Sequence, residues 1–259
     1  MIDLDLRSCE LCPRLCRVNR EEKPGACGCS ARLLAARAAL HFGEEPCISG
    51  AEGSGTVFFS GCNLHCVFCQ NHKISRERYG KALTAARLAD IFRELEAKGA
   101  NNINLVTPTP WVTEIIKALK LHRPNVPVLY NTSGYERVEV LRELEGLVDV
   151  WLPDYKYADS ALAARFSGAA DYPAVARAAM REMYRQSGNL TLNKEGKAVR
   201  GVMIRHLVLP LHLKNSFAVL DDIAALFGTE QYVSLMFQYT PFIKTRFPEL
   251  NRALTGRER

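Results

Sequence analysis

All nine cysteines of this 259-residue chain lie before residue 70. The first residues show no basic start followed by an apolar run, so we expect no secretory leader and a cytoplasmic location. Because the cytoplasm keeps thiols reduced, cysteines crowded at one end of such a chain predict metal ligation rather than disulfides. The cysteines are therefore the strongest constraint on what the chain folds into.

Three of them, Cys62, Cys66 and Cys69, stand in the segment SGCNLHCVFCQN, directly after a predicted strand. Three thiolates on one such loop can converge on a single centre. A structural zinc site takes four closed ligands, and only His65 nearby could supply the fourth. Three thiolates suit a 4Fe-4S cluster that keeps one iron open. We expect this cluster, with chance spacing or a zinc knuckle as the alternative.

After residue 50, short apolar runs alternate with amphipathic helical patterns. The clearest helix is predicted over 84–98, capped by Thr84, because Leu88, Ile91, Phe92 and Leu95 follow helical spacing. Strands are predicted at 56–60, 102–107, 126–131, 148–154, 202–209 and 232–238, with a hairpin over 189–201. The alternation predicts an α/β fold with a parallel sheet, and six strands are too few for a closed eight-stranded barrel. We expect a cysteine-rich metal-binding segment over 1–50 and an open, partial (β/α)6 barrel over 51–259.

Polar residues follow the predicted strands, where ligands gather in folds of this kind. A carboxylate and an ammonium at one strand end, Asp154 and Lys156, can bracket a zwitterionic ligand; a surface ion pair is the alternative. Arg205 interrupts an apolar strand and needs a partner, for which we favour a ligand carboxylate. The other candidates at strand ends are Thr107, Thr109, Asn131 and Ser133.

The CxxxCxxC spacing, with Phe68 before the last cysteine, resembles the signature of the radical S-adenosylmethionine (radical SAM) superfamily. The segments GSGTVFFSGCNLHCVFCQN, YNTSGY and LPDYKY resemble the pyruvate formate-lyase activating enzymes and their uncharacterised relatives. The resemblance covers nearly the whole chain. It implies an oxidoreductase that binds a 4Fe-4S cluster and S-adenosylmethionine (SAM) and cleaves SAM to a 5′-deoxyadenosyl radical for hydrogen abstraction. It also implies an anaerobic activity and an electron donor such as flavodoxin or ferredoxin.

The resemblance assigns SAM contacts to Phe68, to the four strand-end residues, to Asp154 and Lys156, and to Arg205. The activating enzymes carry Gly-Gly-Glu after the second strand, whereas this chain has Thr107-Pro108-Thr109-Pro110. The usual target of those enzymes is a glycyl-radical enzyme. Radical modification of a peptide or a small metabolite, and a non-enzymatic iron–sulfur or zinc scaffold, are the alternatives.

Upstream of the CxxxCxxC loop, Cys9, Cys12, Cys16 and Cys27 form a second group. Four thiolates within nineteen residues can close around an auxiliary 4Fe-4S cluster or a structural zinc ion, and the pattern leaves both open. Cys29 and Cys47 remain without a predicted role.

The formal charge of +6 comes from scattered residues and favours an anionic substrate or partner. The chain shows neither a basic stripe interleaved with aromatics nor a known nucleic-acid-binding motif, so we expect no nucleic acid. No stretch approaches the ~20 apolar residues of a membrane span, so we expect no membrane.

Overall fold

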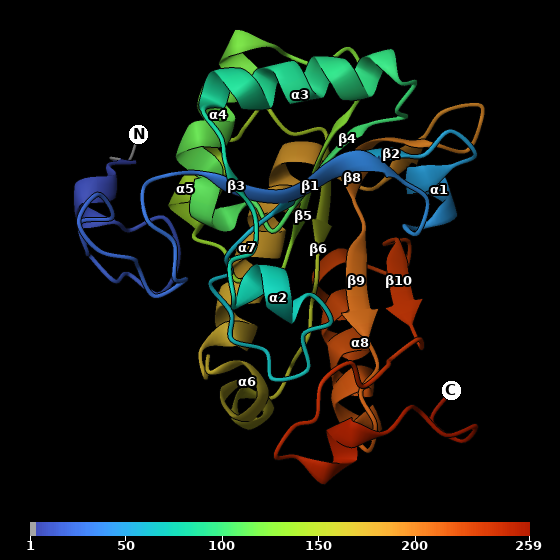
Figure 1. Cartoon of the computed structure of the whole chain (residues 1–259). Helices are drawn as coiled ribbons and strands as arrows, with labels where there is room; N and C mark the ends of the chain where they lie inside the picture. Colours follow the sequence, from blue (N-terminus) through green and yellow to red (C-terminus); the bar gives the residue numbers. More distant parts are fainter. Residues whose placement is uncertain (1–3) are drawn as a thin grey trace.

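The computed structural model describes residues 4–259 and contains one large sheet with five parallel strands at its centre (Figure 1). The strand order is β3-β1-β2-β4-β5-β6-β8-β7, and β9 and β10 form a separate parallel pair. The central strands are β2 (Ser54–Phe59), β4 (Ile103–Val106), β5 (Val128–Thr132), β6 (Val150–Pro153) and β8 (Ala198–Val202). The sheet does not close on itself, so the predicted open α/β barrel is confirmed.

The predicted hairpin over 189–201 is formed by β7 (Thr191–Leu192) and β8, and β8 also pairs with β6. The fifth predicted strand, 202–209, is present as β9 (Ile204–Leu207), which pairs with β10 (Val233–Met236) rather than with the large sheet. An isolated parallel β-bridge between Asp154, just after β6, and Arg205 in β9 joins this strand pair to the large sheet. The six parallel strands of the prediction are thus present, with a break at residue 203.

The structure adds two strands that the sequence pattern did not predict. Strand β1 (Leu34–His41) lies antiparallel to β2, and the short β3 (Lys81–Ala82) pairs with the other edge of β1. Leu34 to His41 is rich in alanine and reads as helical, but the free edge of β2 offers it hydrogen bonds and a buried face. This ladder joins residues 34–41 to the core sheet across residue 50, and the domain division there stays a prediction.

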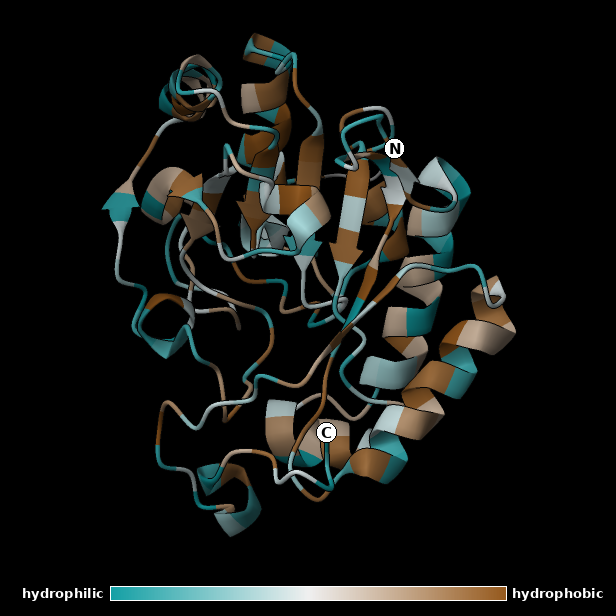
Figure 2. Cartoon of the chain, turned by 90° about the vertical axis from the view of Figure 1, so that its right-hand side faces the viewer, coloured by the Kyte–Doolittle hydropathy of each residue, from teal (hydrophilic) through white to brown (hydrophobic). Residues whose placement is uncertain are grey.

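The helices pack around the sheet and bury its apolar residues, as the brown strands at the centre of Figure 2 show. Helix α3 (Ala85–Ala97) begins where predicted, because the Thr84 side chain accepts a hydrogen bond from the Arg87 amide. No helix within residues 4–259 is long and apolar enough to cross a membrane. The remaining helices are α1 (Pro46–Ser49), α2 (His72–Ser75), α4 (Val112–Leu121), α5 (Val138–Arg142), α6 (Ser160–Ser167), α7 (Tyr172–Ser187) and α8 (Leu213–Phe227).

Side chains alternate between the two faces of the sheet, and this sorts the strand residues. Val57, Ile103 and Leu105 pack with α3 and α4 on one face. Thr56, Asn104 and Asn131 alternate with these apolar positions and therefore lie on the opposite, inner face. Both polar atoms of the fully buried Asn104 side chain lack a hydrogen-bond partner. The inner face thus carries the polar residues of β2, β4 and β5, beside the apolar Leu129 and Leu152.

Gly201 in β8 allows the close approach of the β7–β8 hairpin and is a direct test of this topology. Its φ angle is +117°, and a Cβ atom there would lie 2.2 Å from the carbonyl oxygen of Asn189. We expect Gly201→Ala to lower the free energy of unfolding by about 2 kcal/mol or more, measured by urea denaturation. Gly256→Ala, where a Cβ meets nothing within 4 Å, should change it by less than about 0.5 kcal/mol. Equal stability of the two variants would contradict the strand assignment.

Candidate functional site

The loop after β2 brings Cys62, Cys66 and Cys69 together, and each sulfur has a hydrogen-bond donor. The donors are the amide of Leu64 to Cys62 at 3.4 Å, the Ser167 hydroxyl to Cys66 at 3.0 Å and the Ser75 hydroxyl to Cys69 at 3.4 Å. Burial raises the pKa of the Cys62 and Cys66 thiols, and the Lys156 ammonium opposes this rise at Cys66. Partly buried sulfurs that each accept a hydrogen bond suit thiolates bound to iron.

The end of α6 fixes this loop. The amides of His65 and Val67 donate to the carbonyls of Ser167 and Phe166, at 3.2 and 2.8 Å. The Ser167 hydroxyl lies 2.8 Å from the buried Tyr157 hydroxyl, so a chain of polar contacts runs from the aromatic core to Cys66. Ser167 was not predicted, because a serine at the end of a helix has many ordinary roles in capping and turns.

Asp154 and Lys156 form an ion pair at the end of β6, with Nζ and Oδ2 2.5 Å apart. The two side chains are 23% and 19% exposed, so the pair is largely buried rather than a surface pair. Burial works against the ammonium form of Lys156, but Asp154, Cys66 and Cys69 outweigh it and raise the pKa of Lys156. The electrostatic coupling places this ammonium beside the cysteine loop. The structure therefore brings these two predicted residues to the predicted metal ligands.

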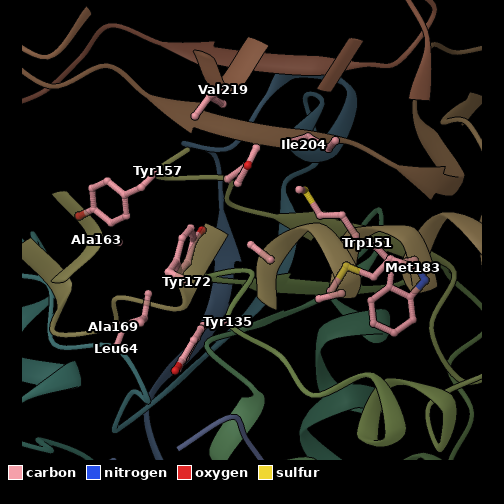
Figure 3. Packing of buried hydrophobic residues seen from close by; sticks show 14 of the residues in the cluster. Leu64, Tyr135, Trp151, Tyr157, Ala163, Ala169, Tyr172, Met183, Ile204 and Val219 are labelled. Atoms are coloured by element: carbon pink, nitrogen blue, oxygen red, sulfur yellow. The ribbon is translucent and has the colours of Figure 1, made fainter. Parts of the chain in front are cut away.

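Tyr172, the first residue of α7, ties two strand ends together. Its hydroxyl donates to the carbonyls of Ser133 and Asp154, both at 2.8 Å, and accepts from the Lys156 amide at 2.9 Å. Its ring stacks between Tyr135 and Tyr155 in a buried aromatic cluster (Figure 3). The approach is close enough that a Cβ on Gly134 would lie 2.2 Å from the Asp154 carbonyl oxygen. The end of β5 is thereby fixed beside the end of β6.

The remaining polar residues at this edge are placed as follows. The Ser133 hydroxyl is buried and lacks a hydrogen-bond partner, and Asn131 is 9% exposed. Thr107 has a φ of +58°, which is unusual for a β-branched residue, and its amide donates to the Asn131 carbonyl. Phe68 packs edge-on against Tyr239, with ring centroids 6.1 Å apart. A strained backbone at Thr107 and a buried Ser133 hydroxyl without a hydrogen-bond partner, both at the same edge of the sheet, are typical of a ligand site.

Thr109 is directed elsewhere. Its hydroxyl donates to the buried Glu136 carboxylate at 2.5 Å, and the Thr132 hydroxyl donates to the same oxygen. The second Glu136 oxygen has no partner, and burial raises the pKa of Glu136 to about 7. Thr109 also lines a cavity with the N-terminal cysteines. Its predicted SAM contact stays a prediction. Glu136 was not predicted, since a lone glutamate after YNTSGY carries no motif.

Arg205 is paired within the protein. Its guanidinium lies 3.3 Å from a Glu44 oxygen and 3.1 Å from a Glu45 oxygen, and the three side chains are at most 16% exposed. Burial disfavours the charged form of Arg205, but Asp154, Glu45 and Glu44 outweigh it and raise its pKa. The partner that a buried arginine needs is thus supplied by residues 44 and 45. A contact between Arg205 and the carboxylate of SAM stays a prediction.

The N-terminal group, Cys9, Cys12, Cys16 and Cys27, lines one cavity, together with Arg20, Asn63, Thr109 and Pro110. The Cys29 thiol faces Cys27 and lowers the pKa of Cys27 to about 6. Cys47 lies apart, against the apolar cluster beneath α1. No three Cys, His, Asp or Glu side chains of residues 4–259 stand at the spacing of a single metal ion.

Comparisons with known proteins identify a family domain in the chain. The model of the radical SAM superfamily matches residues 56–181, which include the three-cysteine loop and both Asp154 and Lys156. An uncharacterised protein of Methanocaldococcus jannaschii, MJ0674, is 32% identical over 262 residues, covering 97% of this chain and 72% of that protein.

Crystal structures of Streptococcus suis SuiB are also similar. The structure of SuiB alone superposes with a TM-score of 0.48 at 14% identity, covering 71% of this chain and 40% of SuiB. The structure of SuiB bound to SAM gives 0.47 at 14% identity, covering 72% and 41%. A third structure shows SuiB bound to its precursor peptide SuiA. The chain thus spans about two-fifths of SuiB.

Residues 56–181 thus form a radical SAM superfamily domain, and this superfamily implies an enzyme. Within the class the chain shares one family with the archaeal protein MJ0674. The superfamily implies a 4Fe-4S cluster and SAM. The residues present fit both groups, because Cys62, Cys66 and Cys69 have a donor on each sulfur and the buried Ser133 hydroxyl has no partner within the protein.

The raised pKa of Glu136 predicts how stability depends on pH. A carboxyl whose pKa is raised from 4.5 to about 7 in the folded state contributes stability below pH 4.5 and loses it as the pH rises through 7. Glu136→Gln keeps the acceptor oxygen and removes the buried charge. We therefore expect this variant to gain about 2–3 kcal/mol over the wild type between pH 5 and pH 8.5, measured by urea unfolding. A difference that does not change with pH would contradict the burial of this carboxylate.

Proposed function

We propose that this enzyme cleaves SAM reductively and abstracts a hydrogen atom from a polypeptide partner, in the first place from a glycine of a glycyl-radical enzyme. The observation that carries the SAM step is the loop of Cys62, Cys66 and Cys69 with Lys156 and Asp154 beside it. Cys62, Cys66 and Cys69 would hold a 4Fe-4S cluster, which would supply the one electron that splits the C5′–S bond of SAM into methionine and a 5′-deoxyadenosyl radical.

The protein's own residues would hold and orient SAM. Lys156 and Asp154 offer an ammonium and a carboxylate for the carboxylate and amino groups of a zwitterionic ligand. Ser133 adds a free hydroxyl, and Asn131, Thr107 and Thr109 extend the polar edge. Phe68 closes the loop with an aromatic face beside the third cysteine. Arg205 would bind the carboxylate of SAM, and its ion pairs with Glu44 and Glu45 would hold its guanidinium in place.

The choice of a polypeptide partner rests on the open sheet. Strand β10 pairs only with β9, so the side of the sheet next to β10 is not closed by another strand. A loop of another protein can approach an open barrel more readily than a closed one. The net charge of +6 favours an acidic electron donor such as flavodoxin or ferredoxin through electrostatic steering.

Formation of 5′-deoxyadenosine tests the SAM step. We expect the anaerobically reconstituted, reduced wild type to form it, and Cys62→Ala to form no more than a protein-free control. Lys156→Met should keep the cluster absorbance but lower the rate about 10-fold or more, because SAM loses a charged contact. Lys98→Met, on the exposed end of α3, is the matched control. Full activity of Cys62→Ala would overturn the proposal.

A separate measurement tests the target. A glycyl-radical enzyme incubated with the active protein, SAM and reductant should develop the electron paramagnetic resonance signal of a glycyl radical. If 5′-deoxyadenosine forms while no glycyl-radical enzyme of the same organism gains this signal, the SAM step stands and the glycyl target is wrong. Radical modification of a peptide or a small metabolite then replaces it.

A further inference from the structure

We propose that Cys9, Cys12, Cys16 and Cys27 bind a tetrathiolate metal centre whose negative charge is balanced by the buried Arg20. The centre is either one 4Fe-4S cluster or one zinc ion, since four thiolates close in sequence can hold either. Because no three of these side chains stand at the spacing of a single ion within residues 4–259, zinc would require the four sulfurs to move closer together. The inference is independent of the proposed function, since it concerns a second site.

The four thiols ring one small cavity. Gly25 packs against two of them, because a Cβ there would meet the Cys16 sulfur at 3.3 Å and the Cys27 sulfur at 3.7 Å. All four line the same cavity, whereas the Cys29 thiol donates to the Ser60 carbonyl outside it.

Arg20 is the observation that points to a charged occupant. Its side chain is 1% exposed, and its hydrogen bonds go to the carbonyls of Ser30 and Pro110, both at 2.7 Å, and to the Cys9 sulfur at 3.9 Å. The Trp111 ring centroid lies 5.0 Å from the guanidinium, and no carboxylate of the described residues forms an ion pair with it. A buried guanidinium without an acidic partner is costly, and four thiolates around a metal would supply that negative charge.

The centre would lie directly against the radical SAM loop. Asn63, the residue after Cys62, lines the cavity, and its carbonyl accepts from the Arg14 side chain at 2.9 Å. His65 contacts the Ala26 carbonyl at 3.1 Å. Folding of residues 9–30 around a metal would therefore fix the loop of Cys62, Cys66 and Cys69 from outside. We infer a positioning role for this centre.

Metal content of a variant without the first site tests the proposal. The full chain carrying Cys62→Ala, Cys66→Ala and Cys69→Ala should retain about one zinc, or about four iron with about four sulfide, per molecule. Retained zinc identifies a zinc site and retained iron with sulfide identifies a cluster. X-ray absorption at the edge of the retained metal should show sulfur ligands only. Absence of stoichiometric metal, or a shell of nitrogen and oxygen, would overturn the proposal.

Two further substitutions in this background assign the ligands. Cys12→Ala with Cys16→Ala should remove the metal, while Cys47→Ala, outside the ring, should leave it in place. Metal retained after loss of Cys12 and Cys16 contradicts the ligand set. Because this background cannot cleave SAM, the result does not depend on the proposed activity.

The role of Arg20 is tested by affinity. In the same background, Arg20→Met should weaken metal binding about 10–100-fold in competition with a chelator, as loss of an outer partner of a metal site does. Arg20→Lys should restore binding to within a few-fold, because it keeps the charge. Arg87→Met, an exposed arginine in α3, serves as control. Equal binding by Arg20→Met and Arg20→Lys would show that packing rather than charge sets the affinity, and would overturn the charge assignment.

Discussion

The hydroxyl of Tyr172 is the interaction on which the geometry of the site depends. It bonds the carbonyls of Ser133 and Asp154 and the amide of Lys156, so one buried phenol sets the spacing of the β5 and β6 ends. The rings around it pack against the same core that supports Tyr157 and, through Ser167, the Cys66 sulfur. The three-cysteine loop and the polar ends of β5 and β6 are thus held by a single aromatic cluster, which fixes both at once.

Local signals in the sequence were sufficient for the parts of the fold that depend on short-range patterning. Helix α3 follows from its apolar spacing and the Thr84 cap, and the parallel strands follow from β-branched runs ending in polar residues. The spacing of the three cysteines alone predicted metal ligation, because cysteines in such a pattern have few other roles. These features need no knowledge of distant contacts.

The features that escaped prediction all depend on distant partners. Strand β1 has the composition of a helix and becomes a strand only because β2 presents a free edge. Glu136 gains its raised pKa from burial beside Thr109 and Thr132, and Ser167 gains its role from Cys66, 101 residues away in the sequence. Arg205 was expected to need a carboxylate, but nothing in the sequence near it pointed to Glu44 and Glu45.

The pairing of Arg205 with Glu44 and Glu45 has a consequence for how the chain is made. Glu44 and Glu45 leave the ribosome well before Arg205, since some 160 residues separate them, and until then two acidic side chains have no counter-ion in the core. The inner face of the sheet therefore cannot close around residues 44 and 45 until β9 has been synthesised. Such long-range contacts slow folding, and we expect residues 44 and 45 to dock late although they are made early.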